Sequence, residues 1–480
     1  MTLDAAVAHA ELQFDSGDFF KHLAQRVACR TESQEPTSAP LLRAYLADQM
    51  APALRALGFC VTLHSNPLAG APPLLTAERL EDPSLPTVLF YGHGDVVRGH
   101  AGQWADGRDP WTLTPDSPAS PADSPKIGAR WYGRGSADNK AQHSINIAAL
   151  AAVLNARGGR LGFNAKWLLE MGEETGSPGL AQFCQQEQQR LAADVLIASD
   201  GPRLRADRPT VFLGSRGVAN FDLVLNARAG GHHSGNWGGL LRNPGTVLAN
   251  AIASLVDGRG VIRVEGLRPP PIPASVRAAL ADITVGGGPA DPAIDTGWGE
   301  PGLSPAERVF GWNTLEVLAF ACGNPAQPVN AIPPNARASL QLRFVVGSQA
   351  GRIRELVLAH LADNGFDDIS CSEPVVMQAT RLDPDNAWVR LALHSLEHST
   401  GIQPALLPNL GGSLPNDVFA CILGLPTVWV PHSYPACSQH APNEHVLPAL
   451  LRQGLGMTAA LLWQVGEQAA TLPRVQRLPH

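Results

Sequence analysis

The sequence has few charged residues and no cluster of one sign. Asp, Glu, Lys and Arg make up 16% of its 480 residues, whereas they supply about 25% of a typical soluble protein. The formal net charge is −7, and Lys and Arg gather with aromatic residues on no stretch of the chain. This pattern excludes the usual electrostatic footprint of nucleic-acid binding, so we expect no nucleic-acid partner.

Long hydrophobic runs are also missing. No stretch approaches the roughly 18 consecutive apolar residues that cross a bilayer. Residues 1–20 lack a basic segment followed by an apolar one, which a secretion signal requires. We therefore expect a cytoplasmic protein with no membrane partner.

Cysteine is sparse and scattered. The seven cysteines contain no CxxC pair, which excludes a disulfide scaffold and favours reduced thiols. The sequence also lacks a G-x-S-x-G elbow, which argues against a Ser/His/Asp hydrolase. We assign no cysteine as a nucleophile or metal ligand.

Enough apolar material remains for a large core, because hydrophobic residues make up 44% of the chain. At about 150 residues per domain, the length predicts about two or three domains. With 47 glycines and 41 prolines, the chain is rich in loops without being of low complexity.

Short apolar runs in the first half predict a layered α/β domain. Residues 1–60 have helical spacing of apolar residues, and a buried helix is expected over 140–154. Residues 87–91, 166–170 and 195–198 are too short for helices and apolar on both faces, as buried parallel strands are.

From about residue 218 the pattern changes to strands with one buried face. In 340–344 apolar residues alternate with Gln341 and Arg343. An α+β domain is expected from two strands and two helices, with loops between them: strands 218–226 and 340–344, helices 244–256 and 351–362, loops 267–273 and 285–289. Because a helix and the apolar run 427–430 follow residue 380, we predict a discontinuous first domain (1–214 and 380–480) interrupted by 215–379.

Acidic and histidine residues stand where the candidate strands end. His93 and Asp95 follow the first run, Glu173 and Glu174 the second, and Asp200 the third. Carboxyl ends of parallel strands meet at one edge of a sheet, so these side chains are expected together. Imidazole and carboxylate groups suit Zn²⁺ or a related transition metal.

A further acid, Asp138, lies in a glycine-rich turn before the expected helix. Taken singly, each residue has an ordinary explanation. The Glu173-Glu174 pair could be a solvated turn, Asp138 a helix N-cap and Asp200 a turn former. Their joint placement favours a metal site.

These residues resemble the pattern of the M20 metallopeptidase family, which includes dipeptidases, aminoacylases and glutamate carboxypeptidases. The resemblance covers nearly the whole chain in the right order. It rests on H-x-D at His93, G-R-G-x-x-D-x-K at 133–140, the pair Glu173-Glu174, Asp200, and His440 within 438–444. It implies a mostly parallel central sheet with helices on both faces, and an inserted α+β (ferredoxin-like) lid or dimerisation domain in a homodimer.

The resemblance also implies roles for these residues. Two divalent ions, zinc with manganese or cobalt as alternatives, would be bridged by Asp138. His93 and Asp200 would hold one ion, and Glu174 and His440 the other. Glu173 would be the general base, and Asp95 would orient the imidazole of His93. The family has a cis peptide after the bridging acid, here Asp138-Asn139. Such ions acidify water and polarise a carbonyl.

In the inserted domain the resemblance implies two further roles. His233, in the segment 231–235, would stabilise the oxyanion, with the adjacent His232 as a competitor for this role. Arg343 would pair with a substrate carboxylate, for which a guanidinium fork is suited. Gly412 and Ser413 resemble a substrate-binding loop. Without the family, each residue also fits an ordinary loop or solvated strand.

Two features depart from the family pattern. Position 200 is Asp, which is more typical of the family's dipeptidases, whereas its aminoacylases generally have Glu there. The stretch 115–125 is longer and richer in Pro and Ser than usual. The first departure favours a peptide substrate, and the second has no role that the residues identify.

The leading hypothesis is a dinuclear amidohydrolase that cleaves a short peptide with a free carboxylate, most simply a dipeptidase. An N-acyl or N-carbamoyl amino acid as substrate is an alternative with the same chemistry. A non-catalytic metal- or peptide-binding protein on the same scaffold is an alternative of another class. The unliganded Glu173 argues against it, because a structural metal site has no need of a free base.

Overall fold

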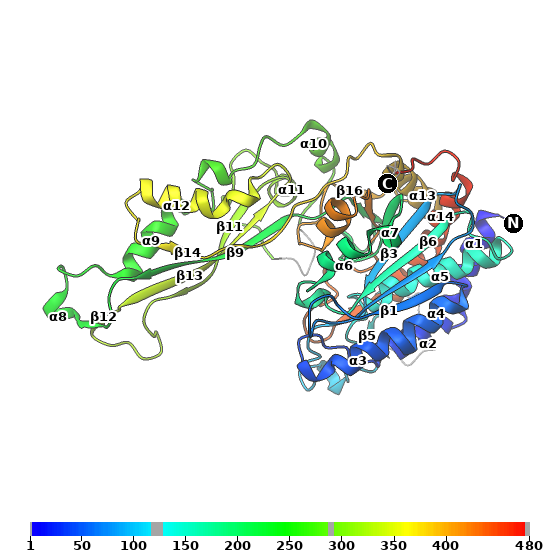
Figure 1. The fold of residues 1–480 in the computed structure, drawn as a ribbon, viewed down its shortest axis with the longest axis horizontal. Helices are drawn as coiled ribbons and strands as arrows, with labels where there is room; N and C mark the ends of the chain where they lie inside the picture. The colour runs from blue at the N-terminus through cyan, green and yellow to red at the C-terminus, as the bar shows by residue number, and fades with distance from the viewer. Residues whose placement is uncertain (1, 117–127, 287–291, 476–480) are drawn as a thin grey trace. The chain divides into compact units, whose positions relative to one another are not determined.

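The computed structural model describes residues 2–116, 128–286 and 292–475, and the chain forms two compact units (Figure 1). Unit 1 consists of Met1–Leu213, Leu382–Leu407 and Pro415–His480, and unit 2 of Gly214–Arg381 and Pro408–Leu414. Of the stretches 115–125 and 285–289 singled out in the sequence, residues 117–125 and 287–289 lie outside the described residues.

An eight-stranded sheet forms the centre of unit 1 (Figure 1). Its neighbours pair in parallel from β6 to β3, β7 and β17 and from β8 to β16, while β1, β2 and the β17–β8 contact add antiparallel pairs. The predicted mostly parallel sheet is therefore confirmed. In sheet order the strands are β1 (Cys60–His64), β2 (Leu74–Arg79), β6 (Asn164–Glu170), β3 (Thr87–His93), β7 (Val195–Ala198), β17 (Thr427–Trp429), β8 (Thr210–Phe212) and β16 (Ala405–Leu407).

Helices cover both faces of this sheet because alternate strand residues enter two apolar layers. Val88 and Phe90 of β3 share one core cluster with residues of α1, α5 and α14. Tyr91 points to the other face, where its ring lies 4.9 Å from Phe419 of the helical turn Val418–Ile422. The helices of unit 1 are α1 (Leu3–Asp15), α2 (Asp18–Val27), α3 (Ala39–Ala44), α4 (Ala51–Ala56), α5 (Lys140–Ala156), α6 (Leu180–Gln186), α7 (Gln188–Leu191), α13 (Ala387–Thr400) and α14 (Pro448–Glu467).

A small sheet lies beside the C-terminal part of unit 1. It joins β18 (His445–Val446), β5 (Trp131–Tyr132) and β4 (Thr114–Pro115) in antiparallel order. Because β18 pairs with β5, the segment before α14 is tied to the turn that precedes α5.

Unit 2 is an antiparallel sheet with two helices packed on one face. The strands β9, β11, β13 and β14 and helices α9 and α12 follow one another as β-α-β-β-α-β, the ferredoxin-like pattern. Alternate residues of β13 from Ala336 to Phe344 are buried, as the sequence pattern predicts. The elements of unit 2 are β9 (Gly217–Asn226), β10 (His232–His233), α8 (Ser234–Trp237), α9 (Pro244–Leu255), α10 (Ala274–Leu280), α11 (Pro305–Phe310), β11 (Thr314–Ala321), β12 (Ala331–Ile332), β13 (Asn335–Phe344), α12 (Ile353–Asp363), β14 (Ser370–Cys371) and β15 (Val375–Met377).

Two further observations bear on the sequence expectations. All seven cysteines are free. Across the described ranges, no helix has both the length and the apolar character that a bilayer crossing needs.

Candidate active site

His93, Asp138 and Asp200 form the first half of a cluster at the carboxyl edge of the central sheet. His93 is the last residue of β3, Asp200 follows β7, and Asp138 precedes α5. The Nε2 atom of His93 lies 3.0 Å from Oδ1 of Asp138 and 3.6 Å from Oδ2 of Asp200. All three residues are buried, and their ligand atoms are close enough to share one cation.

The second half uses the other oxygen of Asp138. His440 Nε2 lies 2.9 Å from Asp138 Oδ2 and 3.0 Å from Glu174 Oε2. The side-chain amide of Gln439 also donates to Asp138 Oδ2. The side chain of His440 is half exposed while that of Glu174 is only 3% exposed, so the cluster opens on the His440 side.

Burial and mutual attraction shift the pKa values of these groups in opposite directions. Burial raises the pKa of Asp200 to about 6 and that of Glu174 to about 7. Hydrogen bonds to Asp138 and Glu174 raise the pKa of His440 to about 10. Burial opposes ionisation of Asp138, but hydrogen bonds from His440 and His93 outweigh it and hold its pKa well below the usual value.

The donor set fits divalent cations. Oδ2 of Asp200 is buried without a hydrogen-bond partner in the described part of the chain. Three carboxylates and two imidazoles converge, and burial alone makes their negative charge costly. Nitrogen and oxygen donors of this kind are those that zinc and neighbouring transition metals prefer.

Asp95 contacts His93 through the ring nitrogen that does not face Asp138 and Asp200. The Nδ1 atom of His93 lies 3.1 Å from the backbone oxygen of Asp95 and 3.3 Å from its Oδ1. The same carboxylate accepts hydrogen bonds from the backbone N–H groups of Glu173 and Glu174, at 3.2 and 3.1 Å. Asp95 therefore contacts the glutamate turn as well as the imidazole, a second contact that the sequence analysis did not foresee.

Glu173 is the carboxylate of the pair that belongs to neither ligand group. It opens the single helical turn Glu173–Thr175 after β6. Burial raises its pKa well above the usual value, and the neighbouring carboxylates act in the same direction. A carboxyl group with a raised pKa can both accept and return a proton near neutral pH.

Glu444 holds the turn that carries Asp138, a role that the sequence analysis missed. Its Oε1 accepts from the N–H groups of Ala137 and Asp138, and its Oε2 from Gly135 N and Arg134 Nη1, all at 2.8–3.0 Å. The peptide bond after Asp138 is cis, as the resemblance implies. The sequence shows an acid at the end of the segment 438–444, but it does not show the partners of this acid, which are about 300 residues away.

In unit 2, Arg343 and Ser413 lie together. Arg343 Nη1 donates to Ser413 Oγ at 2.8 Å, and Ser413 Oγ donates to the backbone oxygen of Arg216 at 2.7 Å. Arg216 Nε also donates to the carbonyl of Gly411, next to Gly412. Residues 408–414 group with unit 2, whereas the sequence analysis predicted 380–480 as part of the first domain.

Arg216 is a second guanidinium at this loop that the sequence analysis did not single out. Burial and the charge of Arg343 lower its pKa to about 10. Neither arginine forms an ion pair within the described residues. The charge of Glu316 acts on Arg216 without an ion pair between them, and two close guanidinium groups favour an anionic ligand.

His232 and His233 form β10 and are both exposed. The Nδ1 atom of His233 accepts a hydrogen bond from Gly235 N at 3.1 Å, whereas His232 packs edge-on against Trp237. That His233, rather than His232, is the oxyanion histidine stays a prediction.

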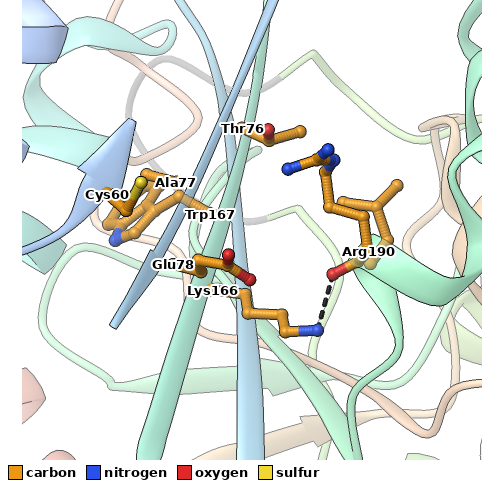
Figure 2. A pocket seen from close by; sticks show the side chains of 8 residues that line it. Cys60, Thr76, Ala77, Glu78, Lys166, Trp167 and Arg190 are labelled. Carbon is orange, nitrogen blue, oxygen red and sulfur yellow. Dashed lines mark hydrogen bonds between the residues drawn. The ribbon is translucent and has the colours of Figure 1, made fainter. Parts of the chain in front are cut away.

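A pocket at the antiparallel edge of the unit 1 sheet is unrelated to the cluster. Figure 2 shows its lining, which includes Cys60 of β1, Glu78 of β2 and Lys166 of β6. Its cavity volume is about 10 Å³, which holds no more than about one water molecule. A substrate does not fit there.

Comparison with known proteins places the chain in a family. The sequence profile of peptidase family M20/M25/M40 matches residues 89–464. The Beta-Ala-His dipeptidase of Mus musculus is 26% identical over 486 residues, 94% of this chain and 93% of that protein. The chain belongs to peptidase family M20/M25/M40 and is a hydrolytic peptidase.

Two solved structures share the fold. Human carnosine dipeptidase 1 aligns with a TM-score of 0.73 at 24% identity, over 97% of this chain and 99% of that one. The dipeptidase Dug1p of Saccharomyces cerevisiae aligns with a TM-score of 0.74 at 22% identity, over 97% and 99%.

Proposed function

We propose that this protein is a dinuclear metal-dependent dipeptidase that cleaves short peptides with a free carboxylate. The observation that carries the proposal is the position of Asp138. Its two oxygens face different imidazoles, His93 at 3.0 Å and His440 at 2.9 Å. A carboxylate with one oxygen in each ligand group is suited to bridge two cations.

The residues divide the chemistry between them. When bound, two divalent ions such as zinc, manganese or cobalt supply Lewis acidity for the scissile carbonyl and the attacking water. Glu173 takes the proton of that water and returns it to the leaving amine. Such proton transfer typically raises the rate about 10²–10⁴-fold. Asp95 fixes the backbone of the glutamate turn, so Glu173 is held for this transfer.

Unit 2 supplies the groups that recognise the substrate. Arg343 and Ser413 bind the free carboxylate, with the backbone around Gly412 beside them. His233 donates to the oxyanion that forms as the amide is attacked. These roles are those of the lid domain that the family resemblance implies.

A dipeptide is favoured over an N-acyl or N-carbamoyl amino acid. Two curated relatives, of mouse and Corynebacterium striatum, match 94% and 69% of this chain and are named as dipeptidases. Asp200, where the family's aminoacylases have Glu, supports the same choice. A panel of dipeptides and N-acetyl amino acids, with protein reconstituted in each metal, separates the two substrate classes.

A homodimer through the β11 edge of unit 2 completes the proposal. β11 ends the five-stranded sheet, and Val317, Leu318 and Phe320 on it are 43, 58 and 45% exposed. An uncovered apolar edge strand pairs readily with another chain. A second copy fits best, because the same edge on both copies is self-complementary.

The decisive experiment replaces the base and keeps the ligands. We expect Glu173→Gln to lower kcat on dipeptides by about 10²-fold or more, while metal content stays near that of the wild type. Wild-type turnover by this variant would show that Glu173 is not the base. A wild-type protein without bound metal or hydrolysis would overturn the whole proposal.

A further inference from the structure

The first turn of α5 carries buried polar side chains that the proposed chemistry does not use. Asn139, Gln142 and His143 are all at most 2% exposed, and so is Tyr45, whose ring lies edge-on to that of His143. Burying amide, imidazole and phenol groups is costly unless each is hydrogen-bonded. Their partners therefore indicate what this turn does.

Tyr45, His143 and Asn139 form a hydrogen-bonded chain, which we call the Tyr45 relay. Tyr45 Oη lies 2.8 Å from His143 Nε2, and His143 Nδ1 lies 3.0 Å from Asn139 Oδ1. Asn139 Nδ2 donates to the backbone oxygen of Ser199 at 2.8 Å.

For a neutral His143 ring, only one assignment of donors fits the whole chain. The Ser199 carbonyl can only accept, so the Asn139 amide nitrogen faces it and Oδ1 faces His143. His143 Nδ1–H then donates to Oδ1, and Nε2 accepts from the Tyr45 hydroxyl. Burial keeps the pKa of His143 well below its usual value, in line with a neutral ring.

Every link of the relay borders a residue of the first ligand group. Asn139 follows Asp138, and Ser199 precedes Asp200. A Cβ at Gly92, before His93, would lie 2.8 Å from His143 Cβ, and one at Gly94 would lie 2.3 Å from the Tyr45 ring. The relay thus packs on both sides of His93.

The second group shares only Asp138 with these contacts. None of the hydrogen bonds of Tyr45, His143 or Asn139 extends to Glu174 or His440, within the described ranges. The two halves share Asp138 but are supported differently, because Glu174 is held through Asp95.

We propose that Tyr45, His143 and Asn139 are positioning residues that hold His93 and Asp200 around Asp138, and so raise the cation affinity of this half of the cluster selectively. This inference rests on the proposed metal site. Residues that hydrogen-bond to metal ligands typically contribute about 10–100-fold to the affinity for the metal.

The test measures Zn²⁺ affinity by competition with a chromophoric chelator in two backgrounds. His440→Ala leaves the His93, Asp138 and Asp200 group complete, and Asp200→Ala leaves the Asp138, Glu174 and His440 group complete. In the first background we expect His143→Phe to weaken Zn²⁺ binding by about 10–100-fold and Tyr45→Phe by a smaller factor. His143→Gln, whose amide can both donate and accept, restores most of the affinity. In the second background each change stays within about twofold of its parent.

Thr76→Val is the matched control, because it also removes one hydroxyl from a histidine Nε2, that of His64 at 2.7 Å. It is expected to leave Zn²⁺ affinity unchanged. Equal losses in both backgrounds, or none in the first, would overturn the relay while the metal site stands. A wild-type protein that binds no Zn²⁺ would overturn the proposed function as well.

Discussion

A single carboxylate, Asp138, organises the candidate site. Four groups converge on it: the imidazoles of His93 and His440, the amide of Gln439, and Glu444, which accepts from its backbone N–H. The sequence predicted that His93 and Asp200 lie close together, because each comes at the end of an apolar run, and the structure brings both to Asp138. The role of Glu444 could not be predicted, because it depends on contacts across about 300 residues.

The buried carboxyl group of Glu170 makes the free energy of unfolding depend on pH. Tyr91 and Ser177 donate to its carboxylate at 2.8 and 2.9 Å, and burial raises its pKa from 4.5 to about 7. Between these values the folded protein binds more protons than the unfolded chain. This contribution to stability is therefore present below pH 4.5 and is lost as the pH rises through about 7.

We accordingly expect the Glu170→Gln variant to be more stable, relative to the wild type, at pH 8 than at pH 5. The difference in free energy of unfolding should be roughly 2–3 kcal/mol, since one pKa unit corresponds to about 1.4 kcal/mol. Denaturant unfolding of the chelated protein measures it. Glu397→Gln, at an exposed carboxylate of α13, controls for loss of charge. A difference independent of pH would contradict the assignment.

The burial pattern of each helix and strand determined whether the sequence could predict that element. The strands β3, β6 and β7 are recognisable because every residue in them is buried. The edge strand β1 has no clean alternation, and the sequence analysis missed it. It also missed α14, whose buried residues lie all around the helix, so no amphipathic stripe marks it.

The turn before α5 depends on one ion pair. Arg134 and Glu444 are each 1% exposed and 2.8 Å apart. Glu444→Ala would leave a buried guanidinium and three N–H groups without their acceptor, so we expect a loss of about 3–5 kcal/mol in stability. We also expect weaker Zn²⁺ binding, because Asp138 lies in this turn. Thermal unfolding and chelator competition measure the two effects.

The matched control is another Arg–Glu pair, Arg157 with Glu467, whose glutamate is 53% exposed. Exposed pairs contribute about 0–1 kcal/mol, so Glu467→Ala should have little effect. If both alanine variants cost the same, burial of the Glu444 pair is not what stabilises the turn.

For the whole molecule, the sequence indicated an inserted unit but not how the chain returns to it. Residues 408–414 group with unit 2, where Leu410 forms backbone hydrogen bonds with Gly214 and Arg216 and the side chains of Arg216 and Arg343 bind the loop. Nothing in the local pattern marks such a crossing, since a Gly-Gly-Ser segment is an ordinary turn by itself. Backbone and side-chain contacts between residues far apart in the sequence hold the loop at unit 2.

The proposed dimer makes a prediction about the β11 edge. A lysine at an exposed position of an edge strand opposes strand pairing between copies, because a second copy would bring two like charges together. We therefore expect Val317→Lys with Phe320→Lys to halve the mass measured by light scattering, with circular dichroism unchanged. Leu12→Lys on α1, which replaces a residue that is 59% exposed in unit 1, should leave the mass as it is. A wild-type protein that is monomeric at all concentrations, or a double variant that stays dimeric, would exclude this edge as the interface.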